Sequence, residues 1–135
     1  HPALDRFDLV LRTFSGRALK SRRLAYALLA EPVDVALAEE RTRFRKTHAA
    51  IFACIIDDAI AEGTVTPRDS KLVAACIAGA IPTALVGPLA PETDAQGNDD
   101  VLNSIVQFCF GALGVTARQT ATKTKLERRP DRPCP

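Results

Sequence analysis

Residues 34–62, DVALAEERTRFRKTHAAIFACIIDDAIAE, carry the longest helical pattern in the chain. Apolar side chains recur in this segment at spacings of three and four, which places them on one side of an α-helix. Asp34 stands before the pattern as an N-cap, and Gly63 follows it as a stop. The apolar stripe consists of Phe44, His48, Ile51, Phe52, Ile55 and Ala59. The segment therefore predicts one long helix with a wide apolar face.

The same spacing recurs in four further segments that are separated by Gly and Pro residues. No segment keeps the period-two alternation of a strand. We therefore predict an all-α fold of five helices, at residues 3–15, 17–30, 34–62, 66–86 and 99–113.

The punctuation between these segments predicts where the helices begin and end. Ser15 and Gly16 close the first helix, with Gly16 in the left-handed conformation. Thr66 and Pro67 begin the fourth helix, and Asn98 or Asp99 caps the fifth. Pro82 lies inside the fourth helix, removes a backbone hydrogen bond and is expected to bend it.

The composition is that of a globular chain, with 135 residues, 47% of them apolar and 25% charged. We expect one helical domain at residues 1–114 and no membrane-spanning segment. Residues 115–135 contain a basic stretch with one Leu and no aromatic residue, which predicts a disordered tail. The chain begins at His1 and contains no Met, so we expect a processed protein or a fragment of a longer one.

The residues that could carry chemistry are few and scattered. Asp57 and Asp58 are adjacent and cannot face each other on a helix. His48 stands alone on an apolar stripe, and no nucleophile, phosphate-binding or metal motif is present. The four cysteines lack metal or disulfide spacing, and Cys54, Cys76 and Cys109 are expected to be buried hydrophobic residues in a reducing cytoplasm. The sequence therefore argues against an enzyme and predicts no metal and no cofactor.

The fifth helix is apolar over more than half of its circumference, which requires burial on two sides. One side can face the core of its own chain. The other side favours a homodimer through the last two helices, and a central helix in a monomeric bundle is the alternative. The predicted dimer face consists of Cys76, Gly79, Ala80, Thr83, Leu102, Ile105, Phe108, Cys109 and Ala112.

Two strings carry a resemblance to a known family: RRLAYALLAEPVD at residues 22–34 and EERTRFRK at residues 39–46. Together with residues 79–81, 84–89 and 108–114, they resemble the C-terminal domain of TetR/AcrR-type transcriptional regulators, over residues 2–114. Pro82 departs from the family, which commonly has a polar residue there.

The resemblance implies a five-helix bundle of the tetracycline-repressor C-terminal type, which senses a small molecule and dimerises. In that family a helix-turn-helix domain precedes this one and binds DNA, so we expect DNA contact only through such a domain, which this chain lacks. An apolar ligand would bind among the first four helices and shift the orientation of the two protomers. We predict that it contacts Phe7, Leu11, Phe14, Tyr26, Phe44, His48, Phe52 and Ile55.

Thr83 is a candidate both for this pocket and for the dimer face, and it cannot easily serve both. Two other functions stay open at this point. The chain could be a free-standing helical homodimer that binds an apolar ligand or a protein partner without DNA, or a small helical enzyme that depends on His48.

Overall fold

The computed structural model describes residues 2–32, 34–91 and 97–116. Within these residues, five α-helices are present and no strand is. They are α1 (Ala3–Lys20), α2 (Arg22–Leu29), α3 (Val35–Ala61), α4 (Ser70–Leu89) and α5 (Asn98–Ala112). The prediction of an all-α chain with five helices is confirmed for this part. The predicted tail, from residue 117 onward, lies outside the described residues.

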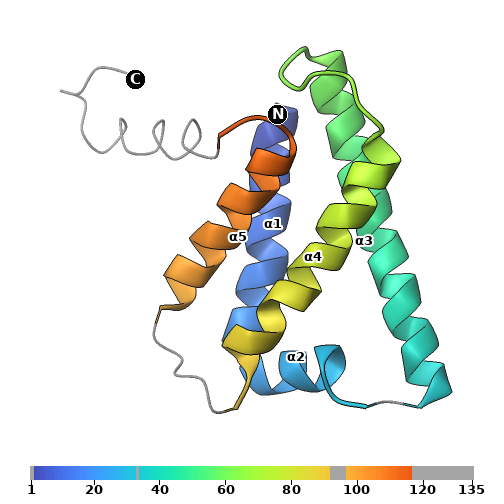
Figure 1. Ribbon diagram of the computed structural model, residues 1–135, viewed down its shortest axis with the longest axis vertical. Coiled ribbons are helices and arrows are strands. Elements are labelled where there is room, and N and C mark those ends of the chain that lie inside the picture. The colour runs from blue at the N-terminus through green and yellow to red at the C-terminus, as the bar shows by residue number, and fades with distance from the viewer. Residues whose placement is uncertain (1, 33, 92–96, 117–135) are drawn as a thin grey trace.

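The helices pack around α1. Figure 1 shows α1 between α5 on one side and α4 and α3 on the other, with the short α2 across the lower ends of α1 and α4. The first part of α3 diverges from the other helices (Figure 1), and residues 35–47 are exposed except for the half-buried Arg41. α3 is therefore held mainly by its second half.

Three aromatic rings from three helices form the centre of the core. Phe7 of α1 meets Phe52 of α3 with ring centroids 5.9 Å apart and Phe110 of α5 at 5.2 Å, both in edge-on geometry. All three side chains are fully buried. Such edge-on pairs contribute about 0.5–1.5 kcal/mol each beyond their burial. This cluster joins helices that are far apart in sequence.

The predicted end of the first helix at Ser15 and Gly16 is wrong, because α1 continues to Lys20. Buried side chains recur at every fourth residue of α1, at Phe7, Leu11, Ser15 and Leu19. One helical face therefore continues through Ser15 into the core. Burial of Leu19 offsets the weak helix preference of Ser and Gly, which costs roughly 1 kcal/mol a residue at most.

Ser15 provides a test of this packing, because its Oγ is buried and has no hydrogen-bond partner. Ser15→Ala is expected to raise the free energy of unfolding by about 1 kcal/mol more than Ser104→Ala, an exposed control position on α5. Both variants gain the same helix preference, so their difference isolates the buried hydroxyl. Urea unfolding followed by circular dichroism measures it. A less stable Ser15→Ala protein would show that the hydroxyl has a partner.

Aspartates begin two of the helices. Asp34 accepts a hydrogen bond from the Leu37 N–H at 2.9 Å, which confirms it as the N-cap of α3. Asp69 does the same for α4, so the predicted start at Thr66 and Pro67 is wrong. The Thr66 hydroxyl accepts from the Arg68 guanidinium at 2.7 Å instead. Thr66 therefore belongs to the connection that precedes α4.

The start of α5 also differs from the prediction. Gly97, with φ of +86°, is the N-cap residue, and Asn98 is already helical. The Asn98 side chain accepts from the Arg22 guanidinium at 3.0 Å. Its amide also donates to the Leu19 carbonyl at 3.4 Å. Asn98 thus ties α5 to the corner between α1 and α2 rather than capping its own helix.

Arginine side chains fasten three helix ends. Arg41 of α3 donates to the carbonyls of Ala27 and Glu31, at the end of α2, at 3.1 and 2.8 Å. Arg68 donates to a carbonyl in the last turn of α5 at 2.8 Å, and Arg22 donates to one in the last turn of α4. Carbonyls at helix C-termini lack helical partners and carry partial negative charge, so a guanidinium satisfies both needs.

α4 is unusually apolar for a helix that is only partly covered. It continues through Pro82 and Pro88 to Leu89, beyond the predicted end at Val86, and Leu72–Leu89 contains no charged residue. By length and composition α4 could cross a membrane, although no membrane-spanning segment is expected from the sequence. Core helices of soluble proteins pass the same test, but only 33% of this apolar window is buried. Of the other positions in this window half are half-buried, and the uncovered part of α4 consists of Leu72, Ala75, Cys76, Thr83, Ala84 and Gly87.

Candidate functional site

An open groove of about 640 Å³ lies between α1 and α3. α1 contributes Leu9 and Val10 to its walls, and α3 contributes Ile51 and Cys54 among others. The lining is mostly apolar, with Arg6 and Thr47 as its hydrogen-bonding side chains. Small-molecule sites in proteins span roughly 300–1,000 Å³ and combine apolar walls with a few polar groups. The groove has the mostly apolar lining of such a site, but it is wide open to solvent.

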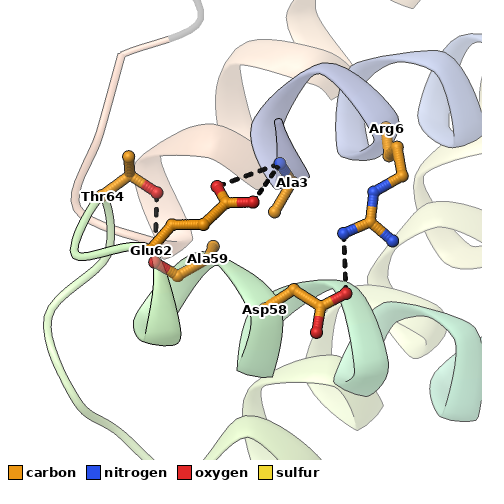
Figure 2. A network of polar contacts seen from close by, with 6 residues as sticks. All are labelled: Ala3, Arg6, Asp58, Ala59, Glu62 and Thr64. Carbon is orange, nitrogen blue, oxygen red and sulfur yellow. Dashed lines mark hydrogen bonds and ion pairs between the residues drawn. The ribbon is translucent and has the colours of Figure 1, made fainter. Parts of the chain in front are cut away.

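A polar network lies at one end of this groove, where α1 begins and α3 ends (Figure 2). Arg6 donates to an Asp58 carboxylate oxygen at 2.6 Å, and this hydrogen bond raises the pKa of Arg6. The Glu62 carboxylate accepts from the Ala3 N–H with both oxygens at 3.1 Å. A carboxylate at a helix N-terminus satisfies a free N–H and is attracted by the partial positive charge of the helix dipole there. The network fixes the two helices side by side.

Aromatic rings lie farther along the same two helices. The His48 imidazole is 3.8 Å from the Phe14 ring and 4.0 Å from the Phe44 ring, centroid to centroid. Phe44 is 62% exposed, so one side of the cluster is open to solvent. Partial burial lowers the pKa of His48 below its ordinary value of 6.5. A neutral imidazole between two rings can offer a hydrogen bond to a ligand.

The predicted ligand-binding residues divide into two groups in the structure. Phe7, Leu11, Phe52 and Ile55 are buried and pack into the core, although Ile55 also reaches the groove. Phe14 and Tyr26 are partly buried against that core. Phe44 and His48 stand nearer the surface of α3. The structure therefore brings Phe14, Phe44 and His48 together, and it buries Phe7, Leu11 and Phe52 in the interior.

The predicted dimer residues also divide. Ile105 and Cys109 are buried within the single chain. Gly79, Ala80 and Leu102 are partly exposed. The exposed members are Cys76, Thr83, Phe108 and Ala112. Phe108 is the large member of this group, with 61% of its area exposed.

Thr83 was a candidate for both surfaces, and the structure places it at an exposed position of α4. Its hydroxyl donates to the Gly79 carbonyl of the preceding turn at 3.0 Å. That bond occupies the donor within its own helix. Neither the α1–α3 groove nor the aromatic cluster includes Thr83.

The cysteine prediction is correct for one residue of the three. Cys109 is buried, and burial raises the pKa of its thiol to about 12. Cys54 and Cys76 are exposed as free thiols. Each is followed by a buried residue, Ile55 or Ile77. Because apolar residues stand on both sides of each cysteine in the sequence, the pattern does not indicate which helix face the cysteine occupies. Cys134 lies outside the described residues.

Sequence reasoning missed most of the groove. It assigned one apolar stripe to the first helix and left out Leu9 and Val10, which lie beside that stripe. Two adjacent apolar residues next to a complete stripe are a signal for a second contact surface. It also missed Arg6, because the partner Asp58 lies 52 residues away in sequence.

His48 makes the stability of the fold depend on pH. Because its pKa is lowered in the folded chain, the unfolded chain binds more protons between the folded value and 6.5. The free energy of unfolding is therefore unaffected by His48 protonation well above pH 6.5. It decreases as the pH falls below 6.5, and this decrease stops below the folded pKa. We expect His48→Gln to remove this part of the pH dependence. Urea midpoints of both proteins at about pH 7.5 and about pH 5.5 measure it, and parallel changes in both would contradict it.

No family model, no curated protein and no solved structure matches this chain. Two features of the described residues offer chemistry for recognition: the groove between α1 and α3, and the uncovered faces of α4 and α5.

Proposed function

We propose that this chain is the small-molecule-sensing and dimerisation part of a TetR-like transcriptional repressor. The observation that supports it most is the partly covered α4, whose 18-residue apolar window is 33% buried. Six positions of this window are exposed, and leaving apolar surface in water is unfavourable by about 25 cal/mol for each Å². A second copy of the chain would cover it.

In this proposal α4 and α5 of two copies form a four-helix interface around a two-fold axis. The open face of α4 contains Cys76, Thr83 and Ala84, whose small side chains allow close approach of a second helix. Phe108 of α5 would provide the large apolar contact. This combination resembles interface cores, in which aromatic anchors are surrounded by smaller contacts.

A ligand would act on the dimer by stabilising one of its arrangements. Its effect is limited to the difference between its affinities for the two arrangements. Two helix-turn-helix domains, one joined to each copy, would then meet their DNA half-sites at a changed spacing. The proposed role is non-enzymatic, and the exposed thiols of Cys54 and Cys76 are compatible with a reducing cytoplasm.

Sedimentation equilibrium of the chain at micromolar concentration tests the dimer. We expect twice the 14.5 kDa mass of one chain. A mass of one chain would contradict the proposal. The coding sequence upstream of His1 tests the DNA-binding role: an in-frame helix-turn-helix segment would support a regulator. A dimer whose gene encodes no such segment would instead be a free-standing ligand-binding homodimer.

A further inference from the structure

The two ends of the α1–α3 groove differ in chemistry. Arg6 lines the groove at one end, and its side chain is 39% exposed, with one guanidinium nitrogen bonded to Asp58. Val10 and Ile51 continue the apolar lining away from Arg6, and Phe14 and His48 lie beyond the lining residues on the same two helices. Arg6 and Phe14 are separated by about 12 Å of helix at roughly 1.5 Å a residue. An occupant with a polar head and an apolar tail would match both ends.

Charge near Arg6 distinguishes between possible head groups. The Arg6 guanidinium is paired with Asp58, and the Glu62 carboxylate lies close to them at the start of α1 (Figure 2). Asp58 therefore neutralises the Arg6 guanidinium, and Glu62 adds one more negative charge at the N-terminus of α1. An anionic head group would meet excess negative charge, whereas an uncharged acceptor could use a remaining N–H donor.

We propose that the α1–α3 groove binds an uncharged, elongated apolar molecule with a hydrogen-bond acceptor at one end, as in a medium-chain ester or ketone. The acceptor lies at Arg6, and the tail extends past Val10 and Ile51 toward Phe14. This inference deepens the proposed sensing function and rests on it for its biological role. It concerns a surface groove. Phe7, Leu11 and Phe52, which the sequence predicts as ligand contacts, are buried in the core instead.

Methyl nonanoate, an uncharged ester, and decanoate, an anion with the same number of carbon atoms, test the head-group chemistry. Titration of the ¹⁵N-labelled chain with each, followed by amide chemical shifts, reports affinity and position together. We expect the ester to shift amides around Leu9, Thr47 and Ile51. Decanoate is expected to bind at least about tenfold more weakly, which corresponds to roughly 1.4 kcal/mol. Equal binding of the two, or no shift at the groove up to the solubility limit of the ester, would overturn the proposal.

Two leucines form a matched pair of variants. Leu9 lines the groove and is 65% exposed, whereas Leu24 on α2 lies outside it and is 63% exposed. Both positions tolerate a charge because both face solvent. Leu9→Glu is expected to weaken ester binding about tenfold, and Leu24→Glu to leave it nearly unchanged. An equal effect of both substitutions would count against the groove.

Arg6→Lys tests the polar end with a readout that a purely structural role would not change. Lysine keeps the positive charge beside Asp58 but replaces the forked guanidinium donors by one ammonium group. We expect the preference for the ester over decane to shrink while the thermal midpoint stays close to that of the parent chain. An unchanged preference would remove Arg6 from the site.

The outcomes separate this inference from the proposed function. A monomeric chain that binds the ester in the groove keeps the site and contradicts the regulator. A dimer that does not bind the ester is consistent with the proposed regulator and contradicts the ligand site in the groove. Concentration-dependent broadening at the groove amides without ligand would show that a second copy covers the groove, and this too would overturn the proposal.

Discussion

Replacing Phe7 by alanine is expected to cost about 3–5 kcal/mol of unfolding free energy, a large share of the roughly 5–15 kcal/mol that stabilises a typical domain. The Phe7 ring is fully buried and touches the rings of Phe52 and Phe110, so its loss leaves a cavity where α1, α3 and α5 meet. The surrounding helices can collapse only partly into that space. Urea unfolding followed by far-ultraviolet circular dichroism measures the change.

Leu9→Ala is the control for this substitution, because Leu9 lies on the same helix and is exposed. It is expected to change the unfolding free energy by less than about 0.5 kcal/mol. If Phe7→Ala cost no more than Leu9→Ala, the three-ring cluster would not be the centre of the core.

Phe108→Glu is expected to dissociate the proposed dimer. Phe108 is exposed on α5, which packs against α4, and a carboxylate at this position would be strongly unfavourable once a second copy desolvates it. We expect the dimer dissociation constant to rise at least about a hundredfold, roughly 2.8 kcal/mol. Sedimentation velocity at micromolar concentration then shows the mass of one chain, 14.5 kDa.

Phe44→Glu is the matched control, since Phe44 is exposed to nearly the same degree but lies on α3. This variant should stay dimeric, because α3 takes no part in the proposed interface. Dissociation by both substitutions would mean that added charge alone causes the effect. Persistence of the dimer in Phe108→Glu would place the interface elsewhere.

The helices themselves could be predicted because their signals are local. Apolar spacing located all five, and the Asp34 cap was identified from one residue. Their ends were harder, because tertiary burial decided them. The Ser15–Gly16 pair is typical of a helix end, yet the helix continues because Leu19 reaches the core one turn later.

The candidate site could be predicted only in part, since it depends on how two helices approach each other. The aromatic residues Phe14, Phe44 and His48 were all identified from the apolar stripes, and they do come together. The polar end of the groove was not identified. Glu62 and Ala3 are 59 residues apart, and no local pattern indicates that the end of one helix caps the start of another.

The buried Cys109 can report how often the native protein opens. Only a thiolate reacts readily with iodoacetamide, and with its pKa raised to about 12 the Cys109 thiol stays protonated and shielded near neutral pH. Alkylation at this residue must wait until α5 leaves its neighbours. Its rate, read from one peptide by mass spectrometry, therefore counts opening events of the native protein, while the accessible Cys54 and Cys76 are labelled at once.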